Sequence, residues 1–154
     1  MYSIVNSSLI IHDLSQDASQ EIFEEIISYL DSSKNLARII TEGLSINDIG
    51  EILNNVSLKI NKEMPFKGKP QTSLNEFWCY IQDFLNHPGR AVLLGLGGVH
   101  DHWSVVKSMS DNRITFFDSD GISFINRTQC STQEPTVKRK HKIYPTHSYF
   151  LSSS

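Results

Sequence analysis

The sequence predicts an α+β domain, in which helices of the first half pack on an antiparallel β-sheet built by the second half. Apolar residues recur at helical spacing up to about residue 86, and after that point they follow the patterns of strands. The length of 154 residues suits one compact domain. We therefore expect a single domain over residues 1–151, followed by a serine tail at residues 152–154.

Composition excludes several classes of protein. The chain has 39% hydrophobic residues, too many for a disordered protein, and its longest apolar run, Ala91 to Leu96, is far too short to cross a bilayer. A net charge of −3 argues against nucleic acid as a partner. Two cysteines make neither a disulfide scaffold nor a zinc ribbon. With no signal-peptide pattern at the start, we expect a cytoplasmic protein, although secretion by a dedicated system stays open.

The first strong periodic signal covers residues 17–30, after a segment at residues 4–11 that suits a short strand or a loop. Apolar side chains recur every fourth position and acidic ones take the opposite side, which is typical of an amphipathic helix. Ser15 or Asp17 can cap its first turn. The residues that define the apolar stripe are Ile22, Ile26 and Leu30.

Two further helices are expected before residue 60. A short one carries the apolar residues of Leu36–Ile40 and stops near Gly43. Another begins at Ser45, since Asp48 three residues later completes a capping-box pattern, and it runs to about Leu53. Three alternating apolar residues then predict a short strand, and residues 61–72 read as a loop. The residues of that expected strand are Val56, Leu58 and Ile60.

The second half begins with a helix and continues as strands. Ser73 and Glu76 form another capping-box pattern, and the helix they open ends before Pro88 and Gly89. The apolar run at residues 91–96 suits a strand covered on both faces. A hairpin-type turn and further apolar runs complete the sheet, with a polar loop at residues 127–140. The other expected strands are residues 103–106, 114–117, 122–125 and 143–151.

The chemistry-bearing residues lie in this strand half. His102 begins one strand and Asp118 ends its hairpin partner, so the two side chains should come side by side. A carboxylate in that place can hold an imidazole in one tautomer and stabilise its charged form. From the spacing alone, a surface ion pair is the simpler alternative.

The stretch PGRAVLLGLGGVHDHWSVVKSMSDNRITFFDSDG and the closing KIYPTHSYFL resemble the papain-like cysteine peptidases, closest to the C39-like group of bacterial peptidases. The resemblance covers about residues 74–151. It implies a papain-like fold and acyl transfer on an amide bond of a peptide or protein substrate, without a cofactor. It also implies that His102 is the general base and that Asp118 orients it. Glutamine deamidase-type effectors share this fold and are a further alternative.

The resemblance places the nucleophile at the N-terminal end of the first long helix, where the helix dipole lowers a thiol pKa. That position falls within residues 16–20, where Ala18 or Ser19 stands instead of a cysteine. An engineered substitution, a natural pseudoenzyme that binds a peptide or protein in the same cleft, and a serine nucleophile are the three explanations. Gln16 is a candidate oxyanion-hole donor.

Neither cysteine fits the missing role. Cys79 lies well inside its helix, on the side away from the apolar stripe, and Cys130 follows both His102 and Asp118 in a polar loop. We expect both to be ordinary structural or surface residues. His100 and His102 also form a His-x-His pair, but no other feature of the sequence supports a metal site.

Overall fold

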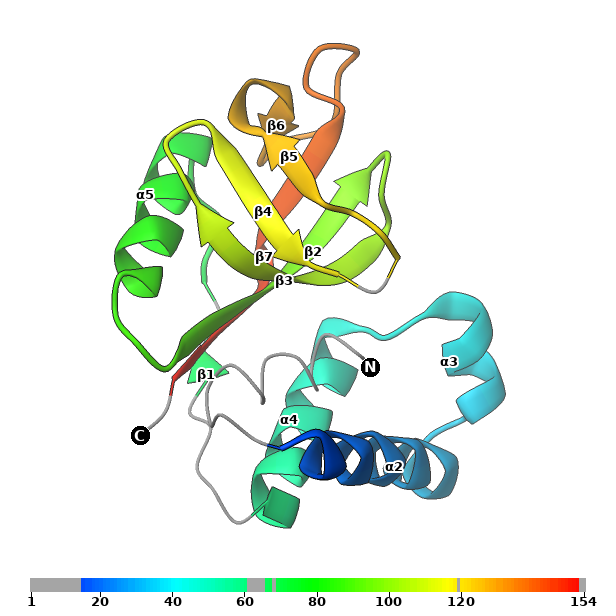
Figure 1. Ribbon diagram of the computed structural model, residues 1–154. Helices are drawn as coiled ribbons and strands as arrows, with labels where there is room; N and C mark the ends of the chain where they lie inside the picture. The colour runs from blue at the N-terminus through cyan, green and yellow to red at the C-terminus, as the bar shows by residue number, and fades with distance from the viewer. Residues whose placement is uncertain (1–14, 61–65, 68, 119, 153–154) are drawn as a thin grey trace.

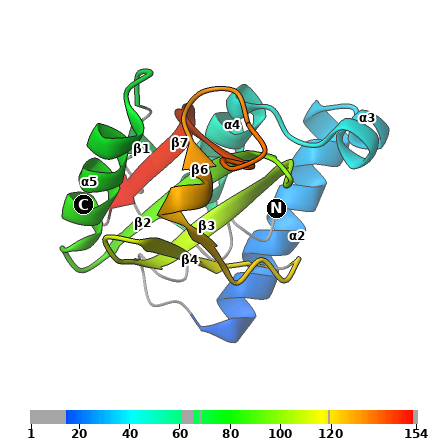
Figure 2. The ribbon, with the colours of Figure 1, turned by 90° about the horizontal axis from the view of Figure 1, so that it is seen from above.

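The computed structural model describes residues 15–60, 66–67, 69–118 and 120–152, and these form an α+β fold. A β-sheet lies between a helical layer on one face and a single helix on the other (Figure 1, Figure 2). The helices of the described residues are α2 (Gln16–Ser33), α3 (Leu36–Glu42), α4 (Ile46–Ile60) and α5 (Leu74–Leu85). The α+β class expected from the sequence is thus confirmed.

The capping signals act as the sequence predicts. Ser15 caps α2 by accepting a hydrogen bond from the backbone N–H of Ala18 at 3.2 Å. At the start of α4, the Asp48 carboxylate accepts from the Ser45 N–H at 2.9 Å while Ser45 Oγ accepts from the Asp48 N–H. Ser73 forms the equivalent reciprocal pair for α5. These hydrogen bonds satisfy N–H groups that a helix cannot pair internally, so each helix begins at a defined residue.

The short strand expected at residues 56–60 is wrong, because α4 continues to Ile60. Val56 is fully buried and extends the helical stripe of Ile49, Ile52 and Leu53, whereas Leu58 is 81% exposed. Three alternating apolar residues are too few to distinguish the period of a strand from that of a helix. The longer helical stripe therefore determines that these residues are helical.

Two other expectations concern the segments at residues 4–11 and 61–72. The segment at residues 4–11 lies outside the described residues. Within the loop expected at residues 61–72, Phe66–Lys67 form a two-residue strand, β1, which pairs with β7.

The sheet has the order β1-β7-β2-β3-β4-β5, with β6 also on β7. All pairs are antiparallel except β6 with β7. The sheet is therefore mixed, whereas the sequence predicts a wholly antiparallel one. The nine residues between β6 and β7 need only return the chain past the two-residue β6, and His141 then pairs with Cys130 so that the two strands run parallel. Besides β1, the strands are β2 (Arg90–Gly98), β3 (His102–Met109), β4 (Arg113–Phe117), β5 (Phe124–Asn126), β6 (Cys130–Ser131) and β7 (His141–Ser152).

Alternate residues of the central strands face two separate cores. Leu93 and Val105 pack with α2 and α4, while Val92, Leu94 and Val106 pack with α5. The apolar run predicted to be covered on both faces is indeed buried throughout. This alternation tells which face of the sheet each site residue occupies.

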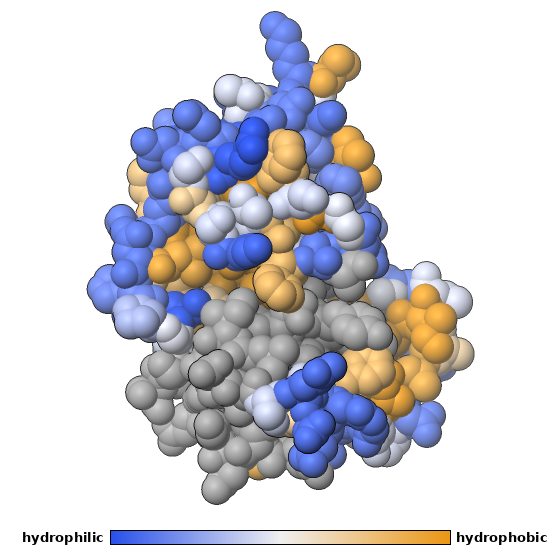
Figure 3. Space-filling model, viewed as in Figure 1, coloured by the Kyte–Doolittle hydropathy of each residue, from blue (hydrophilic) through white to orange (hydrophobic). Residues whose placement is uncertain are grey.

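Two surface features complete the description. Within the described residues, no helix has the combination of length and apolar character needed to cross a membrane. Hydrophobic side chains gather on the surface where Figure 1 draws α3 (Figure 3), and the α3 residue Ile40 is 73% exposed.

Candidate functional site

His102 and Asp118 meet at the end of the β3–β4 pair. His102 Nε2 lies 2.9 Å from Asp118 Oδ2, and the Asp118 side chain is 1% exposed. An ionised carboxylate can only accept a hydrogen bond, so Nε2 carries the hydrogen and the imidazole is held in one orientation. The structure therefore brings together the two residues that the sequence pairs.

The Asp118 carboxylate is held from several sides. The fully buried Ser104 donates its hydroxyl to Oδ2 at 2.5 Å, and the backbone N–H of Asp120 donates to Oδ1 at 2.8 Å. Burial alone would raise the pKa of Asp118, but these hydrogen bonds and the nearby His102 outweigh it and keep the pKa below its ordinary value. The sequence interpretation missed Ser104. Its signal is the position two residues after His102, on the same face of β3.

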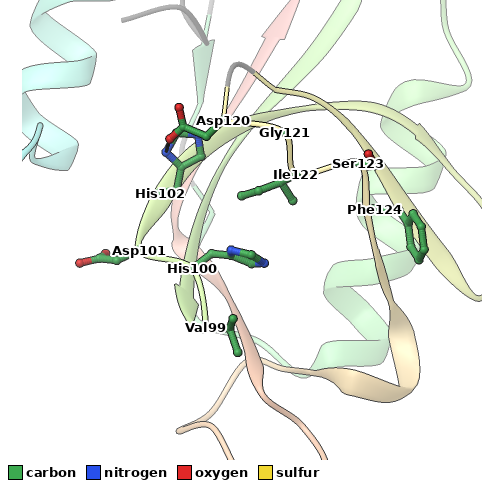
Figure 4. A pocket seen from close by; sticks show the side chains of 9 residues that line it. All are labelled: Val99, His100, Asp101, His102, Asp120, Gly121, Ile122, Ser123 and Phe124. Atoms are coloured by element: carbon green, nitrogen blue, oxygen red, sulfur yellow. Dashed lines mark ion pairs between the residues drawn. The ribbon is translucent and has the colours of Figure 1, made fainter.

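A second carboxylate lies on the open side of the imidazole. Asp120 Oδ2 is 3.3 Å from His102 Nδ1, and the Asp120 side chain is 68% exposed (Figure 4). With Nε2–H donating to Asp118, Nδ1 can donate to Asp120 only when the imidazole is charged. Both ring nitrogens are therefore next to carboxylates, one buried and one exposed.

Two hollows share Asp101 and His102. The first measures about 590 Å³, and in Figure 4 the His100 ring and Ile122 point toward each other across it. The second measures about 390 Å³ and lies where the segment before α4 approaches β2 and β7. The first is lined by Val99, His100, Asp101, His102, Asp120, Gly121, Ile122, Ser123 and Phe124. The second is lined by residues 42–46, Gly95, Leu96, residues 101–103, Tyr144 and His147.

The structure does not bring the expected nucleophile position to His102. Ser19 donates its hydroxyl to the backbone oxygen of Gln16 at 2.7 Å, and neither of them nor Ala18 lines either hollow. Helix α2 packs on the sheet face that carries Val105, whereas strand alternation puts His102 on the opposite face, with Ser104. The sheet itself separates α2 from the imidazole. From the helical half, residues 42–46 approach this region instead.

The two cysteines lie where the sequence analysis expects ordinary residues. Cys79 is exposed on α5. Cys130 is buried, its thiol donates to the backbone oxygen of Asn126 at 3.2 Å, and burial raises its pKa to about 12. Neither lines a hollow that contains His102. A thiol with so high a pKa is not a nucleophile at neutral pH.

The metal alternative gains no support. In the described part of the chain, no group of three or more His, Cys, Asp or Glu side chains is arranged to hold a metal ion. The His100 ring instead stacks on His141, with ring centroids 5.3 Å apart and parallel planes.

Comparisons with known proteins found no matching family model, no matching curated protein and no matching solved structure. Evidence for a function therefore comes from the residues around His102 and from the resemblance of the sequence to papain-like cysteine peptidases.

Proposed function

We propose that the chain is a papain-like cysteine peptidase domain in an inactive form, which binds a peptide along His102 and does not cleave it. One observation supports this best: the buried Ser104 and Asp118 side chains hold the partly exposed His102, which lines two hollows, and neither hollow contains a cysteine. These three residues supply an oriented imidazole, which is the acid–base half of amide chemistry without the nucleophile.

The shape of this surface suits an extended peptide. Asp101 and His102 line both hollows, so a chain that crosses the imidazole can place side chains in both. The first offers the apolar side chains of Ile122 and Phe124 together with polar groups at its rim. Concave sites with apolar walls and a few polar groups are the usual form of binding sites.

Two features oppose cleavage. Acyl transfer by a cysteine peptidase needs a thiolate within hydrogen-bonding distance of the base, and the buried Cys130 cannot supply one. In addition, Asp120 lies against Nδ1, the ring nitrogen that is left to accept a proton once Nε2 donates to Asp118.

The test is a random peptide library presented to the immobilised protein, with both retained and released peptides sequenced by mass spectrometry. We expect retained peptides to stay intact and His102→Ala to weaken their binding about tenfold or more. His87→Ala is the matched control, because His87 is an exposed histidine at the end of α5 and lines neither hollow. Failure to retain any peptide would contradict the proposal. So would cleavage that His102→Ala abolishes.

The second candidate is an active amidohydrolase, such as a glutamine deamidase, that uses a hydroxyl nucleophile. It is favoured by Ser45 and Ser123, each of which lines one of the hollows that contain His102. Against it, the Ser45 hydroxyl donates to Asp48 at 2.7 Å as part of the α4 cap. Ammonia release from glutamine peptides, lost in His102→Ala, would establish this candidate in place of the first.

A further inference from the structure

Aromatic rings line the second hollow and lie close to the glycines of β2. Tyr144 and His147 meet edge to face with ring centroids 5.1 Å apart, and Trp103 lies 6.3 Å from His147. Gly95 of β2 lines the hollow, and Gly97 lies next to the Tyr144 ring. A β-carbon at Gly97 would lie 2.5 Å from Tyr144 Oη, and one at Gly95 would lie 2.9 Å from the His147 backbone oxygen. A larger residue at Gly97 would meet the Tyr144 ring, and one at Gly95 would meet the backbone of His147, so glycine at both positions lets β7 approach β2 closely here.

The Trp103 ring is fixed without any ligand. Its indole N–H donates to the backbone oxygen of Leu44 at 3.0 Å, which ties β3 to the segment between α3 and α4. On the same sheet face, Trp103 stacks near Tyr149 with centroids 6.4 Å apart, and Tyr149 in turn donates its hydroxyl to the Ile46 oxygen. A ring held in this way loses little conformational entropy when a ligand binds against it.

The charges around this hollow are acidic. Among the residues that the structure describes, its lining includes Glu42 and Asp101 and no lysine or arginine. Asp101 has no ion-pair partner among the described residues, and Figure 4 draws its side chain pointing away from the first hollow. Glu42 lies 3.7 Å from Arg38, but that arginine also pairs with the buried Asp48. Glu42 is therefore not neutralised by a partner of its own.

A cation already lies against one of these rings. The Lys142 ammonium sits 4.8 Å from the centroid of the Tyr144 ring, and it also pairs with Glu134 outside the hollow. Aromatic faces attract cations, and a planar guanidinium both stacks on rings and pairs with carboxylates. A ligand group that satisfies the rings and the acidic rim together is therefore cationic and flat.

We propose that this hollow binds an arginine side chain of the peptide, with the guanidinium stacked among Trp103, Tyr144 and His147 and paired with Asp101 and Glu42. The proposal rests on the proposed function, because the rest of that peptide crosses His102. The hollow, at about 390 Å³, is within the usual size range of small-ligand sites.

The first experiment titrates the full chain with N-acetyl-arginine amide and, separately, with N-acetyl-citrulline amide, the neutral analogue of similar shape. The two tryptophans provide an internal comparison in the ¹H–¹⁵N NMR spectrum. Trp103 lines the hollow, whereas the Trp78 indole N–H donates to the Ser110 oxygen next to α5. We expect the arginine ligand to shift the Trp103 indole signal and leave Trp78 in place. Citrulline should bind about tenfold more weakly. Equal binding of the two ligands, or no shift of Trp103, would overturn the proposal.

The second experiment repeats the arginine titration with the double variant Glu42→Gln/Asp101→Asn. Both acids are exposed, so these nearly isosteric changes should leave the fold intact, which circular dichroism checks. We expect arginine affinity to fall about tenfold and its salt dependence to diminish. Glu21→Gln, an exposed acid on α2, is the matched control and should change nothing. Unchanged affinity in the double variant would contradict the assignment.

The two proposals can fail separately. If arginine amide binds but no library peptide is retained, the subsite stands and the peptide-binding function is wrong. If peptides are retained with intact dependence on His102 but show no enrichment of arginine, the function stands and the arginine subsite is wrong.

Discussion

The two carboxylates next to His102 are the same residue type two positions apart, yet their surroundings differ completely. Asp118 is 1% exposed on its side chain and accepts hydrogen bonds from the Ser104 hydroxyl and from backbone N–H groups. Asp120 is 68% exposed and contacts the opposite ring nitrogen at 3.3 Å. A buried, fully satisfied carboxylate can orient an imidazole, whereas an exposed one can leave it at little cost. The buried Asp118 thus orients the imidazole through Nε2, and the exposed Asp120 occupies the other ring nitrogen, Nδ1.

The largest expected effect comes from removing the buried partner. Asp118→Ala leaves the Ser104 hydroxyl and the His102 ring without their acceptor, so we expect the free energy of unfolding to fall by about 3 kcal/mol. Urea denaturation followed by circular dichroism measures it. A loss no greater than that of Asp120→Ala would break the distinction between the two carboxylates.

A smaller loss in the free energy of unfolding is expected for Ser104→Ala. The Asp118 carboxylate keeps its backbone donors and His102 but loses a buried hydroxyl donor, which should cost about 1–2 kcal/mol. The pKa of Asp118 should also rise, because that hydrogen bond favours the charged form. Carboxyl NMR titration measures the pKa, with Ser108→Ala on the exposed part of β3 as the control. An unmoved Asp118 pKa would remove Ser104 from the site.

The pH dependence of stability tests the charge of Asp118 with the nearly isosteric substitution Asp118→Asn, which leaves no cavity. Because the pKa of Asp118 is lowered in the folded protein, its contribution is fully present above the unfolded-state value, about 4, and is lost as pH falls through the folded value. We expect the stability difference between the wild type and Asp118→Asn to be constant from about pH 5 to 7 and to shrink below about pH 4. A difference that persists unchanged at lower pH would mean that the charge of Asp118 does not stabilise the fold.

The smallest effect on stability is expected for the exposed partner. Asp120→Asn should change the free energy of unfolding by less than about 0.5 kcal/mol, since an exposed ion pair contributes little. It should instead alter the His102 Nδ1 environment, which the imidazole ¹⁵N chemical shifts report. A destabilisation as large as that of Ser104→Ala would show that Asp120 stabilises the fold and does not merely contact Nδ1.

Much of this site was predictable because its parts are local. The capping boxes at Ser45 and Ser73 each join residues three positions apart, so a short pattern specifies the contact. The pairing of His102 with Asp118 follows from a hairpin with a short turn, whose register a sequence also limits. Both predictions depend on a few neighbouring residues and not on how distant elements pack.

The expectations that needed distant packing fared worse. The strand expected at Val56–Ile60 was wrong, because burial of the longer α4 stripe against α2 decides the conformation there. The parallel pairing of β6 with β7 depends on the path of a long polar loop, which has no periodic signal.

The sequence by itself determined the helical and strand halves, the helix starts and the His102–Asp118 pair, because periodicity and hairpin geometry act over short distances. Only the tertiary structure decided which sheet face each residue occupies and what approaches it across space. Strand alternation put His102 on the face opposite α2, so Gln16, Ala18 and Ser19 are not brought to the imidazole. The packing of the helical layer on the sheet also brought the segment before α4 to Trp103, Tyr144 and His147. These residues, about a hundred positions apart in the sequence, form the aromatic hollow.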